Sequence, residues 1–380
     1  MSMITSLRSL TKLNSSSGST PATNRQLSIA GMLSNLRQLG KSGLRVSPVA
    51  LGTMALGENW SRLMGDVTQD EARRIFTKYC DLGGNFIDTA NHYQEGQTEE
   101  WIGEFIRERG NREDMVLATK YSLPCPALQT KNSCGNSRKN MMQAVEASLQ
   151  RLQVTYIDLL YVHYWDHQTP PVEIMRGLND LVQSGKVLYL GISDTPAWQV
   201  VRCNMIAEHY GWAPFICYQG RHNIGDRDME REIIPMCREM GLGVAPWSVL
   251  GAGKFSGRFK RGEPERESGR KRVNMSDNDW AISDVVHEIA EELGATPAQV
   301  VLYWSCHTPG ITSPLIGVRK LAQLEDTVKG IDLKLTDEQH QKLQKVADQK
   351  LDLGFPHNFI GQSYEANFCN DPVAFFNMFS

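Results

Sequence analysis

The sequence predicts an α/β fold: a single (β/α)8 barrel of the TIM type with an N-terminal extension and an aromatic-rich C-terminal tail. Eight short apolar segments alternate with amphipathic helical patterns. The segments begin at intervals of about 30 residues, which is the length of one β/α unit. A chain of 380 residues, 41% hydrophobic and 22% charged, is also long enough to bury the core of such a barrel.

The eight predicted strands are residues 49–51, 85–87, 116–119, 157–162, 187–192, 215–218, 242–245 and 313–316. The predicted helices between them are residues 69–82, 98–109, 138–152, 171–183, 197–209 and 227–240. Gly185 and Gly241 directly follow helical patterns, and Thr336 and Gln339 are spaced as a capping box. The segment 157–162 is apolar apart from one aspartate, which suits a parallel strand buried on both faces.

The competing architecture is a doubly wound open sheet that binds a dinucleotide. That fold places G-x-G-x-x-G directly after an early strand. Here Gly251 and Gly253 are followed by Gly257, one residue too late, and they come after the seventh predicted strand. A P-loop fails as well, because Asn35 stands where the first glycine is needed. The barrel is therefore the favoured prediction.

Composition excludes several classes of function. A net charge of −3 gives no electrostatic footprint for nucleic acid. No window approaches the roughly 20 consecutive apolar residues that span a bilayer, so a membrane protein is not expected. The eight cysteines form no C-x-x-C pair, which indicates reduced thiols and a cytoplasmic location.

The two ends of the chain differ from its middle. Residues 1–35 contain nine Ser, four Thr and no acidic residue, so they are either a disordered tail or a mitochondrial presequence. Residues 36–350 are predicted to form the barrel. Residues 351–380 contain seven aromatic side chains, which either pack on the barrel exterior or wall the active-site mouth.

Four polar, proton-handling side chains follow successive predicted strands: Asp88, Tyr93, Lys120 and His163. Working residues of a barrel lie at the C-terminal ends of its strands, so these four are expected to converge at one mouth. The set suits proton delivery to a carbonyl group. We expect the Lys120 ammonium to lower the pKa of Tyr93.

The remaining two residues complete this chemistry. Asp88 is expected to hold the ammonium by a charge-assisted hydrogen bond, and His163 to donate to the substrate oxygen. Such a site supplies an acid and an oxyanion pocket but no reductant, so a nicotinamide cofactor must bring the hydride.

A metal site is the alternative use of His163, which is spaced H-x-x-x-H with His167. That spacing joins two imidazoles on a helix, whereas extended chain after a strand separates them by roughly 13 Å. No metal is expected.

Five segments resemble the aldo-keto reductase family: GKSGLRVS (40–47), FIDTANHY (86–93), ATK (118–120), IDLLYVH (157–163) and GKVLYLGIS (185–193). The resemblance spans roughly residues 36–350 and is strongest to the fungal aryl-alcohol dehydrogenase and norsolorinic acid reductase type. It implies a role in secondary metabolism and a catalytic tetrad of Asp88, Tyr93, Lys120 and His163. In that tetrad Tyr93 is the general acid in reduction and the base in oxidation.

The resemblance also implies NADP(H) as cofactor and a set of contacts to it. Ser193, Asp194 and Gln219 stand where the family holds the nicotinamide amide, and Trp247 where it stacks on the ring. Asp194 replaces the usual Asn, which removes a donor. The positions that match the phosphate and adenosine contacts are Ser248, Leu250, Gly253, Lys254, Gly317, Arg319, Gln323, Asp326 and Thr327. Arg319 is the candidate for the 2′-phosphate, and Thr327 replaces the usual Asn.

The implied substrate is an aldehyde or ketone, or the corresponding alcohol, and is expected to be aromatic. Trp60 and Trp165, on loops after the first and fourth predicted strands, are candidates for its aromatic wall. No nucleic-acid or membrane partner is expected, and monomer and homo-oligomer both stay open. The alternative function is a nicotinamide-binding regulatory subunit, as in the related potassium-channel β subunits. A barrel isomerase without nicotinamide is a third possibility, disfavoured by Ser193, Gln219 and Arg319.

Overall fold

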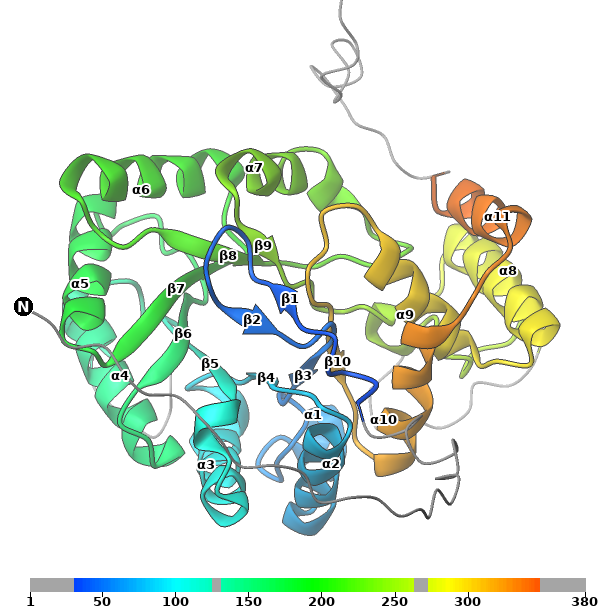
Figure 1. Cartoon of the computed structure of the whole chain (residues 1–380), viewed down its shortest axis with the longest axis horizontal. Coiled ribbons are helices and arrows are strands. Elements are labelled where there is room, and N and C mark those ends of the chain that lie inside the picture. The colour runs from blue at the N-terminus through cyan, green and yellow to red at the C-terminus, as the bar shows by residue number, and fades with distance from the viewer. Residues whose placement is uncertain (1–30, 125–130, 263–272, 349–380) are drawn as a thin grey trace, which may run out of the picture.

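A parallel eight-stranded barrel forms the centre of the computed structural model, which describes residues 31–124, 131–262 and 273–348 (Figure 1). The sheet runs in the order β10-β3-β4-β5-β6-β7-β8-β9. The two end strands approach each other, since Thr312 N donates to Val244 O at 2.8 Å and Leu315 N to Pro246 O at 2.8 Å. These hydrogen bonds close the ring, and the predicted (β/α)8 barrel is confirmed.

The barrel strands are β3 (Ala50–Gly52), β4 (Phe86–Asp88), β5 (Val116–Tyr121), β6 (Ile157–Val162), β7 (Val187–Ser193), β8 (Phe215–Gln219), β9 (Gly243–Val244) and β10 (Leu315–Gly317). The helices that follow them in turn are α2 (Gln69–Asp81), α3 (Gln97–Arg109), α4 (Arg138–Leu152), α5 (Pro171–Gln183), α6 (Ala197–Tyr210), α7 (Ile233–Met240), α9 (Pro297–His307) and α10 (Leu321–Thr327). Three further helices are α1 (Ser61–Met64), α8 (Asp277–Leu293) and α11 (Asp337–Asp348). Short 3-10 turns are η1 (Tyr93–Gly96), η2 (Arg112–Asp114), η4 (Asp228–Glu230), η5 (Gly251–Gly253) and η6 (Val328–Asp332).

Most elements lie where the sequence predicts them, and β6, α4 and α5 have the predicted bounds. One prediction is wrong: residues 227–240 do not form one helix. A continuous helix would place Pro235 in its interior, where proline lacks a donor and clashes with the preceding turn. Instead η4 ends before α7 begins, and Pro235 lies in the first turn of α7, where it is tolerated.

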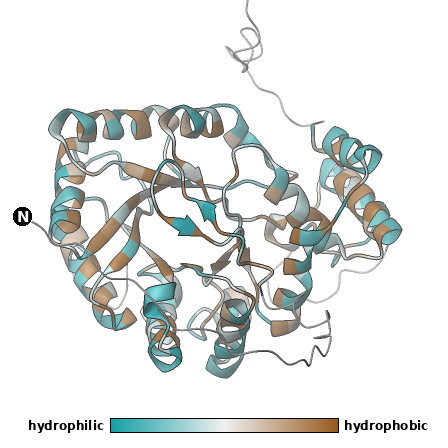
Figure 2. Cartoon of the chain, in the orientation of Figure 1, coloured by the Kyte–Doolittle hydropathy of each residue, from teal (hydrophilic) through white to brown (hydrophobic). Residues whose placement is uncertain are grey.

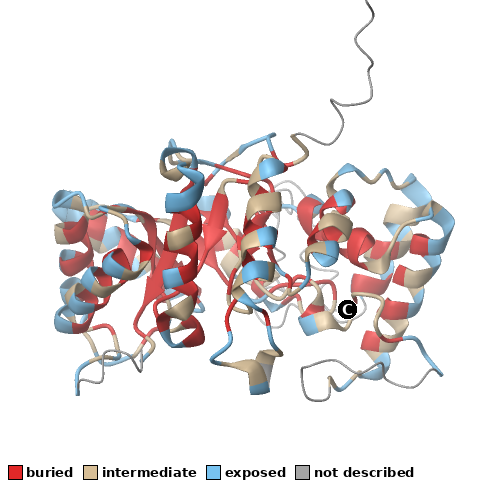
Figure 3. Ribbon diagram, turned by 90° about the horizontal axis from the view of Figure 1, so that it is seen from below, coloured by how far each residue is buried: buried red, intermediate tan, exposed pale blue. Residues whose placement is uncertain are grey.

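Two layers of apolar side chains fill the fold. Inside the barrel, small and aromatic side chains from several strands meet, among them Ala118 of β5, Tyr161 of β6 and Cys217 of β8. Two larger clusters lie between the strands and the surrounding helices. Figure 2 shows the resulting pattern, with hydrophobic strands at the centre and hydrophilic outer faces on the helices. Figure 3 shows that the strands and the inward helix faces are the buried parts.

Helices α8, α9 and α11 form a third cluster beside the barrel, on the right of Figure 1. The predicted capping box is confirmed at the start of α11, where Gln339 N donates to the Thr336 hydroxyl at 3.2 Å and Thr336 N donates to Gln339 Oε1 at 3.0 Å. This cluster adjoins the loop after β9 and braces one side of the mouth.

The N-terminal hairpin of β1 (Arg37–Gln38) and β2 (Arg45–Val46) closes the barrel floor. Leu39 is fully buried in the interior cluster, and Lys41 N donates to Gly241 O at 2.8 Å. In Figure 1 the hairpin lies across the middle of the ring. With the floor closed, the other end of the barrel is the open mouth.

None of the helices in the described ranges is long and apolar enough to cross a membrane. The expectations for residues 1–30 and for the tail from residue 351 concern chain outside those ranges and stay predictions.

The close approach of the hairpin to the barrel depends on Gly40. Its φ is +62°, and a Cβ there would lie 2.5 Å from Gly241 O. We expect Gly40→Ala to lower the free energy of unfolding by about 2–4 kcal/mol, through left-handed strain plus overpacking. Gly211→Ala is the matched control, because Gly211 has a φ of +67° with no atom within 4 Å of its Cβ position, and about 1–2 kcal/mol is expected. Denaturant unfolding measures both, and equal losses would contradict the close-approach argument.

Candidate active site

The four predicted catalytic side chains converge at the open mouth of the barrel. Asp88 ends β4, Lys120 lies near the end of β5, and His163 directly follows β6. Tyr93 begins the turn η1 beyond β4. Parallel pairing aligns the strand ends at one rim, with Asp88 opposite Ala118 and Lys120 opposite Tyr161. Residues far apart in the chain thus meet because each follows a neighbouring strand.

The Lys120 ammonium is the centre of a buried hydrogen-bond network. Its Nζ lies 2.5 Å from Asp88 Oδ1, 2.9 Å from Thr89 O and 3.2 Å from the Tyr93 hydroxyl oxygen. An ammonium has three donors, so these three acceptors satisfy it completely. Gln219 Nε2 donates to the other Asp88 oxygen at 2.8 Å. Lys120 is fully buried and Asp88 is 1% exposed, so the charges are paired away from water.

This network determines which groups carry a proton. Burial alone would lower the pKa of Lys120, but the Asp88 carboxylate and the Tyr93 phenol outweigh it, so the pKa is raised and the ammonium persists. Burial raises the pKa of Tyr93, and the opposing effect of Lys120 does not overcome it. The net direction for Tyr93 is therefore opposite to the sequence expectation, because desolvation of the phenolate is the larger effect. Tyr93 is a phenol whose oxygen accepts from Lys120 and whose own proton stays available.

His163 and its neighbour His92 are both neutral. Burial, followed by repulsion from Lys120 and His92, holds the pKa of His163 well below its usual value. Burial and then Lys120 lower the pKa of His92 to about 4. Neutral imidazoles offer one donor and one acceptor each.

Aromatic rings surround the Tyr93 hydroxyl. The ring centroids of Tyr93 and His163 are 5.8 Å apart with an edge-on arrangement, and those of Trp60 and Tyr93 are 6.5 Å apart. The ring centroid of His92 lies 5.5 Å from that of Trp60 and 4.9 Å from that of His163. The structure therefore brings the predicted wall residue Trp60 into the site, along with His92.

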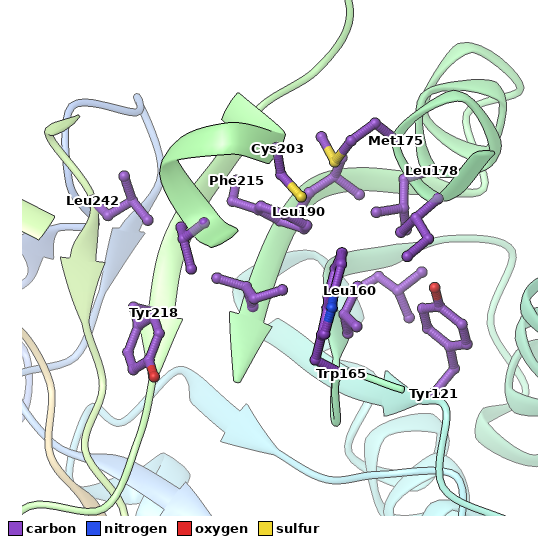
Figure 4. Packing of buried hydrophobic residues seen from close by; sticks show 14 of the residues in the cluster. Tyr121, Leu160, Trp165, Met175, Leu178, Leu190, Cys203, Phe215, Tyr218 and Leu242 are labelled. Carbon is purple, nitrogen blue, oxygen red and sulfur yellow. The ribbon is translucent and has the colours of Figure 1, made fainter. Parts of the chain in front are cut away.

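Trp165 lies elsewhere. It is 4% exposed and packs in the cluster between the barrel and its outer helices. Figure 4 shows its indole beside Leu160, in the same cluster as Tyr121 and Leu178. The structure does not bring Trp165 together with Trp60.

Sequence reasoning missed Gln94, which holds the loop that carries Trp60. Its side chain is fully buried, donates to Met54 O at 3.0 Å and accepts from Trp60 N at 2.6 Å. Gln94 has a φ of +51°, a left-handed conformation that non-glycine residues rarely adopt. A Cβ on Gly57 would lie 2.3 Å from Gln94 Cγ, so this contact needs glycine. No signal in the sequence marks a glutamine for such a turn.

The residues expected to hold a nicotinamide lie along the neighbouring rim. Ser193 ends β7 opposite Gln219 at the end of β8, and Trp247 N donates to Gly220 O at 2.9 Å. The Trp247 indole nitrogen donates to Asp194 Oδ1 at 3.1 Å. The Asp194 carboxylate therefore orients the Trp247 indole by accepting this hydrogen bond.

A cleft of about 570 Å³ lies next to this rim, lined by Arg221, Trp247, Ser248 and Lys254 among others. Lys254 Nζ is 2.7 Å from Asp279 Oδ2, which leaves further ammonium donors for another acceptor. Leu250 and Gly253 belong to the same loop, and the Leu250 side chain packs against the α8–α9–α11 cluster.

The predicted adenosine-side residues lie at the end of β10 and on α10. Arg319 Nη1 donates to Met64 O at 2.7 Å, so other guanidinium donors remain. Gln323 Oε1 accepts from Arg319 N at 2.9 Å and fixes this turn, which directly follows Gly317. Asp326 accepts from Thr296 and Gln299, each at 2.7 Å, and is thus engaged within the fold, while Thr327 is buried.

These residues fit a phosphorylated dinucleotide. The rim offers polar groups at Ser193 and Gln219 and a partly exposed indole at Trp247. Lys254 and Arg319 both keep donors that can bind phosphate oxygens. Within the described ranges, no group of three or more His, Cys, Asp or Glu side chains could hold a metal ion.

The mouth of this parallel barrel thus holds a buried Asp–Lys–Tyr network beside a neutral histidine, an arrangement that can donate a proton to a bound oxygen atom. Comparison with known proteins specifies the family. The sequence model described as the aldo/keto reductase family matches residues 48–348. The chain belongs to the aldo/keto reductase family.

Relatives of known name cover most of the chain. Norsolorinic acid reductase A of Aspergillus parasiticus is 40% identical over 340 residues, which is 87% of this chain and 86% of that relative. The aryl-alcohol dehydrogenase [NADP(+)] of Phanerodontia chrysosporium is 39% identical over 348 residues, which is 87% of this chain and 90% of that relative. Both belong to the type that the sequence resembles.

The neutral state of His92 predicts a pH dependence of stability. The pKa of His92 is about 4 in the folded chain, against about 6.5 when unfolded. Between these values the unfolded chain binds an extra proton, so this contribution to stability is complete above pH 6.5 and is lost as the pH falls toward 4. We expect the free energy of unfolding of His92→Phe to fall less than that of the wild-type chain between pH 6.5 and pH 4, by up to about 3 kcal/mol. Urea unfolding at several pH values measures it, and parallel curves would rule it out.

Proposed function

We propose that the chain is an NADPH-dependent reductase that transfers hydride to an aldehyde or ketone, with Tyr93 as general acid. In the reverse direction it oxidises the alcohol with Tyr93 as base. One observation carries the proposal: the buried Tyr93 hydroxyl accepts from the Lys120 ammonium at 3.2 Å, which leaves its own proton for another acceptor beside the ring of neutral His163. A substrate carbonyl is the acceptor that fits.

Each residue of the tetrad has its own role in the proposed reduction. A carbonyl oxygen between Tyr93 and His163 receives two hydrogen bonds, which polarise the carbonyl carbon. A nicotinamide cofactor, when bound, supplies the hydride. As negative charge develops on the oxygen, the Tyr93 proton moves to it. The ammonium of Lys120 then lies 3.2 Å from the new phenolate and stabilises it, while Asp88 holds the ammonium in place.

Gln219 connects this acid to the cofactor rim. Its amide donates to Asp88, and its backbone oxygen accepts from Asp194 N at 3.0 Å. The hydrogen bond to Asp88 therefore fixes the Gln219 side chain in advance for contact with a cofactor. This arrangement supports binding of the nicotinamide end beside Tyr93.

The preference for NADPH rests on Arg319, whose guanidinium bonds only to Met64 O among the described residues and has further donors that suit a phosphate group. An aromatic substrate is favoured because the ring centroid of Trp60 lies 6.5 Å from that of Tyr93, so its indole offers an aromatic surface at the site. The names of the relatives, aryl-alcohol dehydrogenase and norsolorinic acid reductase, support an aromatic substrate.

Replacing the acid tests the function directly. We expect Tyr93→Phe to lower kcat for NADPH-dependent reduction of benzaldehyde by about 100-fold or more, since general acid catalysis contributes this much. NADPH affinity, measured by fluorescence titration, should change less than about threefold. Tyr121→Phe is the matched control, because the Tyr121 hydroxyl is buried without a hydrogen-bond partner among the described residues. Turnover that survives in Tyr93→Phe would refute the acid role, and a wild-type chain that binds NADPH without reducing any aldehyde would favour the regulatory-subunit alternative.

Replacing Arg319 tests the cofactor preference. We expect Arg319→Leu to raise the Kd for NADPH by about 10-fold or more and to leave the Kd for NADH within about twofold, because a charge-assisted contact to phosphate is worth about 1.5–3 kcal/mol. Arg107→Leu, an exposed arginine on α3, is the control. Equal weakening of both cofactors would contradict the phosphate contact.

A further inference from the structure

His92 lies at the centre of the rings that surround the reacting position, although it has no part in the proton network. Its ring centroid is 5.0 Å from Tyr93, 4.9 Å from His163 and 5.5 Å from Trp60. It lies on the turn between β4 and η1, next to Tyr93 in the chain. Any molecule that contacts both His163 and Trp60 therefore passes over His92.

Two ring nitrogens at this place lack partners. Nδ1 of His92 and Nδ1 of His163 are both buried, and no described residue hydrogen-bonds to either. A buried polar atom without a partner costs about 1–3 kcal/mol. No described contact fixes the tautomer of His92, so its imidazole can present either N–H or a lone pair to a ligand. Both Nδ1 atoms are closed to a ligand in this conformation, so Nε2 is the nitrogen that each ring can present to a substrate, and two adjacent imidazoles suit a ligand with more than one polar atom.

Counting lone pairs separates the roles of the two histidines. A carbonyl oxygen has two lone pairs. In the proposed reaction Tyr93 and His163 use both of them. His92 therefore has no acceptor left on the carbonyl oxygen, yet it lies within one ring contact of both residues. Its partner must be a second atom of the substrate, close to the carbonyl.

We propose that His92 is a substrate-binding residue that hydrogen-bonds a second oxygen, carried by the carbon next to the one that bears the carbonyl group. The favoured substrates are then aromatic aldehydes and ketones with an ortho hydroxyl. This specificity rests on the proposed function of the site, because it assigns the carbonyl oxygen to Tyr93 and His163. Trp60, whose ring centroid is 5.5 Å from that of His92, offers an indole surface for the aromatic ring of such a substrate.

The test compares 2-hydroxybenzaldehyde with 2-methylbenzaldehyde, which have ortho groups of similar size. The ratio of their kcat/KM values is measured in the wild-type chain, in His92→Phe and in His92→Leu. Comparing ratios between variants cancels the intrinsic reactivity of each aldehyde. Loss of one neutral hydrogen bond is expected to lower the hydroxyl-to-methyl ratio about 3- to 10-fold, chiefly through KM. His209→Phe, the same substitution on the outer helix α6, should leave the ratio within about twofold of wild type.

The outcomes separate the two levels of the argument. Thermal melting shows which of the two His92 variants is folded. If that variant turns over both aldehydes with the same hydroxyl-to-methyl ratio of kcat/KM as wild type, the role of His92 is overturned and the proposed function is not. An equal KM for the two aldehydes in the wild-type chain also overturns the role of His92, and this arm needs no variant. If the wild-type chain turns over no aldehyde, the proposed function fails and the role of His92 fails with it.

Discussion

The ion pair between Lys120 and Asp88 is the interaction on which the rest of the site depends. Each charge is removed from water, and breaking a buried pair by removing one partner typically costs about 3–5 kcal/mol. The structure offsets desolvation by using every donor of the ammonium and by directing Gln219 to the second carboxylate oxygen. Strands β4, β5 and β8 are therefore tied together at the mouth by the same contacts that position Tyr93.

The main features of the fold, and the meeting of Asp88, Lys120 and His163 at one rim, could be predicted because strand boundaries are local in sequence. Strand β6 is an apolar run between clear breaks, and Asp88, Lys120 and His163 each follow such a run. Prediction from the sequence stops where distant contacts decide. The orientation of Trp165 depends on packing against residues of other elements, and the conformation of Gln94 depends on the loop that it holds. The net pKa direction of Tyr93 depends on burial, which a list of charged neighbours does not give.

The two ends of the barrel serve different purposes. At the floor, the approach of Gly40 to Gly241 and the burial of Leu39 leave no room for a ligand. At the mouth, polar groups are left with unused hydrogen-bonding capacity in Tyr93, His92 and His163. The floor is therefore closed by packing alone, whereas the mouth combines a buried ion pair that ties strands together with groups that are free for chemistry.

Burial is the main cause of the protonation states of three groups at the mouth, and one buried charge acts on all three. The Lys120 ammonium contributes to the lowered pKa values of His92 and His163, and it stabilises the phenolate that Tyr93 forms. If either imidazole were protonated, it would repel the ammonium and lose its acceptor nitrogen. Neutral histidines are therefore a consequence first of burial and second of the lysine beside the acid. The charge that stabilises the phenolate of Tyr93 thus acts in the same direction as burial, which leaves both imidazoles able to bind oxygen atoms of a substrate.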